Sequence, residues 1–431
     1  MPPATKPLNS DVFGVCLGDA AVPVGRLKFV SQGRRELAQF VYEDSWLSHE
    51  RCFEISPDLP RQSGYFSRRA AGDRDSPFFF ALADTEPDAW GRQVIDRAHA
   101  KARRKDATLA PLRAIDYLCA VDDFSRIGAL RLTSGDQCLR AVPQGERATP
   151  PFIELERVYR ATRAVESSKE TQEDLRYLQG KGTSLGGMRP KCTVLDETGH
   201  LAIGKFPSIA DSMNVTRAEV LALRLARRAG IDVPEARAVE VKGIPIALIR
   251  RFDRTTTGAR IPYLSAASML QAEREERRAY TELVDLLMRK GANPSADARE
   301  LWRRLAFNLL ITNTDDHLRN LGFLYDGGGQ WRLAPAFDLN AMPGKLRESK
   351  TWLSEDSGPI DSIGMLMDAC GYFKLSGSDA RTVLEEVVDA IDAWRHEGMA
   401  PEVGLTKREL DAFKDAFEHD QTREARELLR A

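Results

Sequence analysis

The most constraining stretch of this 431-residue sequence is a polar run that leads directly into a predicted β-hairpin. The run covers residues 313–320 (NTDDHLRN), the hairpin turns near Gly328, and the chain then reaches Ala336-Phe-Asp338. Residues that oppose each other in an antiparallel hairpin have Cα atoms about 4.5–5.5 Å apart. The turn position therefore places Asn320 close to Asp338 at the open end of the hairpin, with Asp315 just upstream. Oxygen-bearing side chains that converge in this way suit a Mg²⁺–nucleotide site.

The spacing inside the run also matches a template for phosphoryl transfer. In protein kinases, a metal-binding asparagine follows the catalytic aspartate by five positions. Asp315 and Asn320 have this spacing, so the pattern selects Asp315 rather than Asp316 as the proton acceptor. Asp338 then corresponds to the second metal-binding residue. A turn decorated by Asp and Asn is the structural alternative, and the sequence leaves open whether His317 acts as a base or orients the loop.

A second signal is a glycine-rich segment at 182–187, followed by Lys191 and by two predicted strands at 192–195 and 201–205. Side chains alternate along a strand, so Lys205 shares one face with Leu201 and Ile203. A lysine on a buried face needs an anion, and a nucleotide phosphate is the natural candidate. The alternative is a lysine at a strand end that extends into solvent.

A predicted helix over 216–228 offers two roles for Glu219. Its position three residues after Thr216 predicts a capping box at the start of the helix. As an alternative, Glu219 could form an ion pair with Lys205, as a helix glutamate does in protein kinases. The sequence does not decide between the two.

The remaining composition excludes several classes of protein. Lys and Arg number 62 against 64 Asp and Glu, so the charge balance does not call for nucleic acid. The six cysteines lie far apart without a CxxC motif, which argues against a zinc site and a disulfide framework. No stretch approaches 18 apolar residues, and the N-terminus lacks the apolar core of a signal peptide. We therefore expect a soluble cytoplasmic protein with no membrane partner.

Taken together, the motifs resemble the HipA family of bacterial toxin kinases. Six matching stretches occur in order, at 184–191, 203–207, 218–234, 251–254, 314–320 and 333–338. Residues 86–92 and 127–132 also resemble the N-terminal domain of that family, so the likeness covers nearly the whole chain. It implies an α+β, two-lobed, protein-kinase-like fold. We expect a β-rich N-terminal subdomain at 1–145, a linker near 144–151, a kinase-like core at 146–255 and a mostly helical C-terminal lobe at 256–431.

The resemblance also implies an ATP- and Mg²⁺-dependent serine/threonine kinase. Asp315 would accept the proton, and Asn320 and Asp338 would hold Mg²⁺. The residues expected around ATP are Gly186, Gly187, Met188, Arg189, Pro190, Lys191, Lys205, Arg250, Arg251, Phe252, His317, Asn320, Phe337 and Asp338. Among these, residues 250–252 would form the hinge beside adenine. Ser184 matches the loop serine that family members autophosphorylate, and the added charge should displace the loop from ATP.

The same resemblance implies partners. Family kinases phosphorylate translation proteins, notably aminoacyl-tRNA synthetases, and are usually paired with a small helix-turn-helix (HipB-like) antitoxin that binds operator DNA. Residues 187–190 differ from the Gln/Glu-containing loop of some members, so loop behaviour can differ here. Two other readings stay open. One is a metal-dependent phosphohydrolase that uses Asp315, Asp316, His317 and Asp338, and the other is a kinase-fold corepressor that binds the antitoxin without catalysis.

Overall fold

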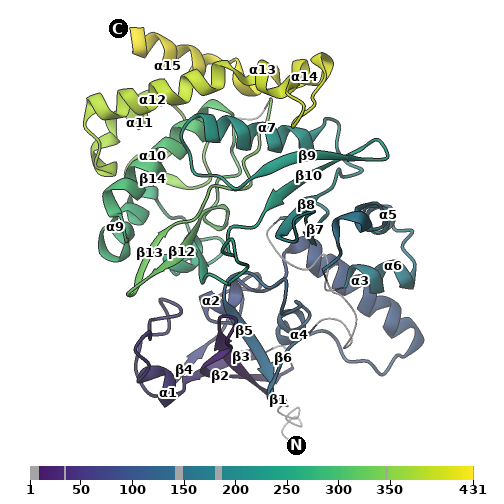
Figure 1. Cartoon of the computed structure of the whole chain (residues 1–431). Helices are drawn as coiled ribbons and strands as arrows, with labels where there is room; N and C mark the ends of the chain where they lie inside the picture. The colour runs from purple at the N-terminus through teal and green to yellow at the C-terminus, as the bar shows by residue number, and fades with distance from the viewer. Residues whose placement is uncertain (1–8, 34, 141–148, 180–186, 345–347, 431) are drawn as a thin grey trace, which may run out of the picture.

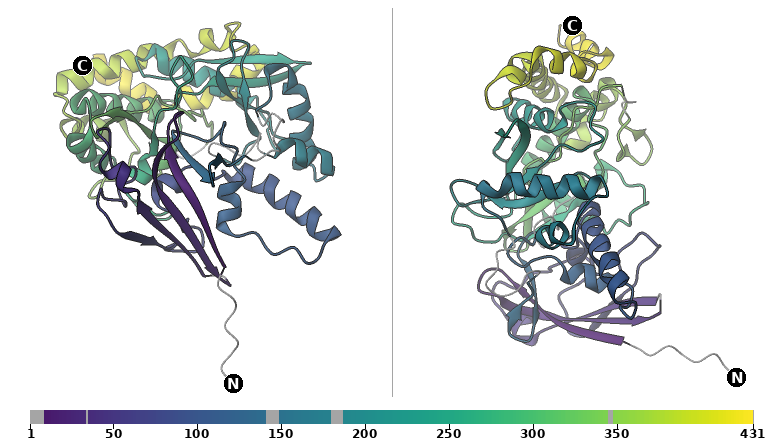
Figure 2. Two further views of the ribbon diagram at one scale, coloured as in Figure 1. Left: turned by 60° about the horizontal axis from the view of Figure 1, so that its bottom comes forward. Right: turned by 90° about the vertical axis from the view of Figure 1, so that its right-hand side faces the viewer.

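The computed structural model describes residues 9–33, 35–140, 149–179, 187–344 and 348–430. A six-stranded sheet lies at one end of the molecule, a four-stranded sheet lies in the middle, and a helical body forms the other end (Figures 1 and 2). This arrangement confirms the predicted α+β, two-lobed class. None of the helices in these ranges has the length and apolar character needed to cross a bilayer.

The N-terminal sheet has the strand order β4-β3-β2-β1-β5-β6. Its strands are β1 (Asn9–Leu17), β2 (Val22–Gln32), β3 (Arg35–Tyr42), β4 (Tyr65–Arg68), β5 (Leu130–Ser134) and β6 (Gln137–Cys138). Strand β5 begins only at Leu130, because Gly128 has a φ of +69° and its N–H donates to the Asp253 carboxylate over 2.7 Å. This contact ties the sheet to the middle of the chain.

The helices that follow the first strands pack on both neighbouring sheets. Helices α1 (Asp44–Leu47), α2 (Phe80–Ala83) and α4 (Ala114–Cys119) are short, and α3 (Ala89–Lys105) is long. Trp90 and Val94 of α3 are buried in one apolar cluster with α5 (Leu155–Glu166), α6 (Gln172–Leu178) and the middle sheet. The start of α3 therefore lies against the middle sheet. Most of the predicted linker, 144–148, lies outside the described residues.

The middle sheet has the order β7-β8-β10-β9. Its strands are β7 (Lys191–Leu195), β8 (Leu201–Lys205), β9 (Ala236–Val241) and β10 (Ile244–Arg250), and α7 (Val215–Arg228) packs against β9 and β10. The capping box predicted for Thr216 and Glu219 is wrong. Asn214 is the N-cap, and its side chain accepts a hydrogen bond from the Arg217 N–H. Glu219 is thereby left free to face β8.

The C-terminal part contains the predicted hairpin. Strand β11 (Tyr263–Ser265) pairs with β12 (Gly322–Gly327), which pairs with β13 (Gln330–Leu333) and sets Phe323 opposite Leu333. A smaller pair is formed by β14 (Trp352–Ser354) and β15 (Gly358–Pro359). Helix α10 (Pro294–Leu310) is buried along most of its length and ends at the polar run. The hairpin thus starts and ends beside this run, as predicted.

The helical body surrounds α10. The other elements are α8 (Ala266–Met269), α9 (Tyr280–Lys290), α11 (Ile363–Asp368), α12 (Gly377–Asp392), α13 (Trp394–Met399), α14 (Lys407–Phe417) and α15 (Asp420–Arg430), together with the 3-10 turns η1 (Phe152–Glu154), η2 (Leu318–Asn320) and η3 (Cys370–Phe373). Residues 380–430 are divided among several separate helices. Thr406 caps α14 in a capping box, which marks one of the breaks.

Candidate functional site

A cleft of about 1880 Å³ lies where the N-terminal region, the middle sheet and the segments that flank the β12–β13 hairpin meet. Several predicted site residues line it together, namely Gly187, Met188, Lys205, Arg250, Arg251, Phe252, His317, Asn320, Phe337 and Asp338. Asp315 lies in a small adjoining pocket that shares His317, Asn320 and Asp338 with the cleft. The fold therefore brings most of the predicted set to one place. Ser184 and Gly186 lie outside the described residues.

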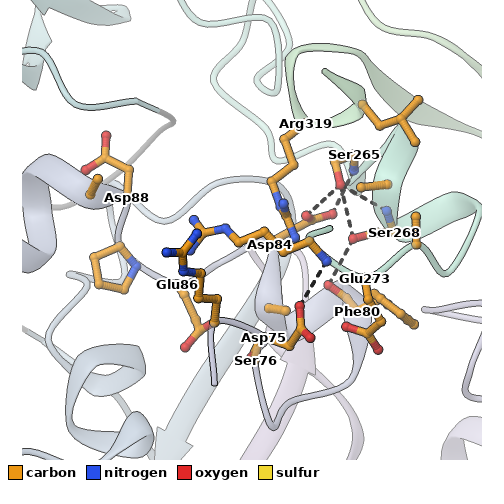
Figure 3. A pocket seen from close by; sticks show the side chains of 18 of the residues that line it. Asp75, Ser76, Phe80, Asp84, Glu86, Asp88, Ser265, Ser268, Glu273 and Arg319 are labelled. Carbon is orange, nitrogen blue, oxygen red and sulfur yellow. Dashed lines mark hydrogen bonds between the residues drawn. The ribbon is translucent and has the colours of Figure 1, made fainter. Parts of the chain in front are cut away.

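The wall of the cleft opposite the hairpin belongs to the N-terminal region. Figure 3 shows Asp84, Glu86 and Asp88 along this wall, with Arg319 reaching over from the polar run. The Asp84 carboxylate accepts hydrogen bonds from the backbone N–H and the hydroxyl of Ser265, over 2.7 and 2.8 Å. This double contact fixes the N-terminal region to β11, which pairs with β12 of the hairpin.

Lys205 is the centre of the charged cluster at the inner end of the cleft. It is the last residue of β8, and its ammonium forms ion pairs with Glu219 on α7 and with Asp338 after the hairpin. All three side chains are largely buried. The backbone of Asp338 is in the left-handed region with a φ of +54°, a conformation that costs a non-glycine residue free energy and that is common at functional sites. The structure thus brings together three elements that lie far apart in the sequence.

The electrostatics of this cluster follow from burial and pairing. Burial acts to lower the pKa of Lys205, but Asp338 and Glu219 outweigh it, so the pKa lies above its ordinary value. Burial acts to raise the pKa of Asp338, and the two lysines Lys205 and Lys191 reverse this, so the pKa is lowered. The pKa of Glu219 is raised by burial. Lys205 is therefore charged and Asp338 ionised at neutral pH.

The polar run separates its two aspartates by their surroundings. The Asp315 carboxylate is 36% exposed, and Lys350 is its ion-pair partner. The Asp316 carboxylate is buried and accepts hydrogen bonds from the Tyr280 hydroxyl and the Lys350 backbone N–H, over 2.8 and 2.6 Å. Burial raises the pKa of Asp316 to about 6. Asp315 is thus accessible, whereas Asp316 is a fixed part of the loop.

Asn320 and His317 complete the run. The Asn320 amide nitrogen donates to the Asp315 carbonyl over 2.8 Å, so its amide oxygen stays available as a ligand. His317 is half-buried, and this burial lowers its pKa, so its ring is neutral at neutral pH. Its Nδ1 atom has no hydrogen-bond partner among the described residues. This buried nitrogen is therefore unpaired within the described part of the chain.

The described end of the glycine-rich segment lies at the edge of the cleft. Met188 is 84% exposed, and Arg189 forms an ion pair with Asp211 at 2.6 Å. The Pro190 carbonyl accepts from the Phe206 N–H over 3.0 Å, which joins this segment to the end of β8. Lys191 is buried, and its ammonium lies 3.5 Å from the Asp88 carboxylate. Residues 189 and 191 therefore face protein side chains rather than the open cleft.

The predicted hinge residues differ in what their side chains do. Arg251 is buried, pairs with Asp253 at 2.6 Å and donates to the Ser125 carbonyl over 2.6 Å. Its guanidinium is therefore used in holding the N-terminal region, and a role beside adenine would fall to its backbone. The rings of Phe252 and Phe337 lie 5.5 Å apart and form an apolar contact in the cleft wall. Arg250 forms a partly exposed ion pair with Glu235.

Sequence reasoning missed several residues that the structure places at the site. Asp88 and Lys350 belong to this group, as does Tyr280, which positions Asp316. Asp88 follows a proline and precedes Ala-Trp-Gly, so its position as a helix N-cap could have been predicted. Its contact with Lys191 could not, because no local pattern connects the two. Lys350 carries no recognisable signal.

The residues fit a magnesium ion bound together with a nucleotide. In the described part of the chain, no group of three or more His, Cys, Asp or Glu side chains is placed to hold a metal ion by itself. Asn320 and Asp338 supply an amide oxygen and an ionised carboxylate that line one cleft. Mg²⁺ is usually held by one or two protein oxygen ligands, with phosphates and water for the rest. The donor set therefore suits a metal that arrives with a phosphate ligand.

The fold places this protein in the protein-kinase-like class. Residues 183–395 match the family model of the HipA-like C-terminal domain. The chain thus carries a HipA-like C-terminal domain, and the predicted resemblance to the HipA family is confirmed. The solved structure of HipA from Shewanella oneidensis, in complex with HipB and its operator DNA, has a similar fold with a TM-score of 0.69. That likeness covers 97% of this chain and 99% of that chain at 15% sequence identity.

Curated relatives carry kinase names. A Sinorhizobium fredii protein named "Putative kinase Y4mE" is 27% identical over 329 residues, which are 72% of this chain and 73% of that protein. A Haemophilus influenzae protein named "Putative kinase" is 26% identical over 186 residues, 37% of this chain and 52% of that protein. This chain therefore spans about half of the Haemophilus relative.

Proposed function

We propose that this chain is an ATP- and Mg²⁺-dependent serine/threonine protein kinase. The observation that carries the proposal is the joining of Lys205 to Glu219 and Asp338 at the inner end of a cleft, with Asp315 accessible nearby. Protein kinases need a strand lysine paired with a helix glutamate and a metal-binding aspartate at the same place. Strand β8, helix α7 and the segment after β13 supply these three residues here, although they lie far apart in the sequence.

The residues divide the binding of nucleotide among them. Lys205 would contact phosphate oxygens, Asn320 and Asp338 would hold Mg²⁺, and the Phe252–Phe337 contact would face the adenine ring. Bound MgATP supplies the transferable phosphoryl group and neutralises the charge that develops on it. The exposed tip at Met188 would cover the phosphates. Each of these roles uses a group that already lines the cleft.

Asp315 would accept the proton of the attacking serine or threonine hydroxyl. Its partly exposed carboxylate suits this role because a substrate side chain can reach it, whereas the buried Asp316 cannot be reached without opening the loop. Lys350 would hold the Asp315 carboxylate in place until the substrate arrives. A general base of this kind typically contributes 10²–10⁴-fold to a rate.

We also propose that the kinase is the toxin of a toxin–antitoxin pair. Its partner would be a small helix-turn-helix (HipB-like) antitoxin, which would connect it to operator DNA. Support comes from the Shewanella oneidensis protein of similar fold, which was solved with HipB and operator DNA. The substrate would be a protein of the translation machinery, such as an aminoacyl-tRNA synthetase, so the activity would be cytoplasmic.

The proposal includes autophosphorylation of Ser184, which lies outside the described residues. Phosphopeptide mass spectrometry after incubation with MgATP tests it directly. Phosphate on the peptide that contains residues 182–189 would support regulation at this loop. Absence of phosphate from that peptide, while phosphate appears elsewhere on the chain, would reject this site.

The main test is transfer of labelled phosphate from ATP to protein. We expect transfer with Mg²⁺, none with a chelator, and loss of transfer in Asp338→Ala. Nucleotide binding without transfer would instead favour the kinase-fold corepressor. Metal-dependent release of phosphate from phosphomonoesters without ATP would favour the phosphohydrolase, a reading that gives Lys205 no role.

A further inference from the structure

Asp88 connects the N-terminal region to residues 187–191, which include the described end of the glycine-rich segment. It caps helix α3, and one carboxylate oxygen, Oδ1, accepts a hydrogen bond from the Gly91 N–H over 2.6 Å. The other oxygen, Oδ2, lies 3.5 Å from the Lys191 ammonium. Both side chains are only 4% exposed. In Figure 3, Asp88 lies on the cleft wall close to Glu86.

A second contact between the same two segments lies next to the first. The backbone N–H of Trp90 donates to the Gly187 carbonyl over 3.3 Å, and the Trp90 ring is buried in the apolar cluster of the middle sheet. Gly187 has a φ of +102°, and a Cβ atom on it would lie 2.9 Å from the Lys191 ammonium. The start of α3 therefore holds both ends of the segment 187–191.

Burial makes the Asp88–Lys191 contact important for the position of Lys191. A buried ammonium without an opposite charge tends to lose its proton or to move towards water. Oδ2 of Asp88 has no hydrogen-bond partner among the described residues. Its contact with the Lys191 ammonium is therefore an ion pair without a hydrogen bond. Lys191 is thus held in place by a residue outside the kinase-like core.

We propose that Asp88 is a positioning residue that holds Lys191, and with it the segment 187–191, at the edge of the cleft. The N-terminal region is then part of the nucleotide site rather than only an attached module. This inference rests on the proposed function, because it assumes that the cleft binds a nucleotide.

The test is Asp88→Asn, measured without catalysis. Asparagine is as good an N-cap as aspartate, so the helix start is kept while the charge is removed. Hydrogen exchange of the peptide 187–195 without nucleotide should become faster. The affinity for Mg²⁺ with a non-hydrolysable ATP analogue, measured by calorimetry, should fall about tenfold, as expected for one charged contact. Thr171→Ala, which removes the cap of the neighbouring helix α6, should lower the melting temperature and leave the affinity unchanged.

A double variant shows whether Asp88 acts through Lys191. If it does, Asp88→Asn combined with Lys191→Met should bind the analogue no more weakly than Lys191→Met alone. Additive losses, or an Asp88→Asn variant that binds as tightly as the wild type, would overturn the inference. If the wild type binds no nucleotide, the proposed function fails with it, whereas the exchange rates still report whether Asp88 holds the loop.

Discussion

Replacing Lys205 by methionine should destabilise the protein in a strongly pH-dependent way. Lys205 is the cation between the buried carboxylates of Glu219 and Asp338. Methionine fills a similar volume and removes only the charge. Breaking a buried ion pair by removing one partner typically costs about 3–5 kcal/mol, because the remaining charge is left uncompensated.

The pH sets an upper limit on this cost. An aspartate that cannot stay ionised takes up a proton instead, and with an ordinary pKa near 3.9 this costs about 4 kcal/mol at pH 7 but only about 1.5 kcal/mol at pH 5. In the variant, the folded-state pKa of Asp338 lies above the unfolded value, so stability is lost as the pH rises through that pKa. In the wild type the pKa of Asp338 is lowered, so no such loss occurs. The difference between the two proteins should therefore grow from pH 5 to pH 7.

Urea unfolding of both proteins at pH 5, 6 and 7 measures this difference. We expect Lys205→Met to be less stable by about 3–4 kcal/mol at pH 7 and by roughly half of that or less at pH 5. The matched control is Lys242→Met, which removes an exposed lysine paired with Glu156 and should not change stability measurably at any pH. A Lys205 variant as stable as the wild type at pH 7, or a deficit independent of pH, would refute the reasoning.

Two further predictions concern buried aspartates. Burial raises the pKa of Asp316 to about 6, so its ionisation should lower the stability of the folded protein by up to about 3 kcal/mol as the pH rises from about 4 to about 6. The variant Asp316→Asn should not show this decrease. Parallel curves of stability against pH for the two proteins would contradict the prediction. Asp253→Ala leaves Arg251 and Arg254 buried without their carboxylate, so it should cost about 3–5 kcal/mol in urea unfolding at pH 7. Arg251 and Arg254 outweigh burial and lower the pKa of Asp253, so the stability that the Asp253 carboxylate contributes should be lost only in acid, below about pH 4. The control is Asp326→Ala, which removes an exposed ion pair with Arg332.

Local spacing is what made much of the candidate site predictable from sequence. The run 313–320 and the hairpin that follows are close in the chain, so turn position alone brings Asn320 towards Asp338. The strand that ends at Lys205 was predictable from its alternation. Such features depend on a few neighbouring residues, and the fold has little freedom to change them.

Contacts between distant segments could not be predicted in this way. The sequence offered two roles for Glu219, and the ion pair with Lys205 formed because Asn214 already caps the helix. Arg251 was expected beside adenine, yet its side chain is used by Asp253, two residues later in the chain. The contact of Asp88 with Lys191 depends on how α3 packs against the middle sheet, which no local pattern specifies.

The most direct test of the central claim is a comparison of Asp315→Asn with the wild type in two assays on the same samples. One assay measures binding of Mg²⁺ with a non-hydrolysable ATP analogue, and the other measures transfer of labelled phosphate from ATP to protein. We predict unchanged nucleotide affinity and a loss of transfer of at least about 100-fold, because Asp315 acts on the substrate hydroxyl and not on the nucleotide. Transfer at the wild-type rate in Asp315→Asn would contradict the account.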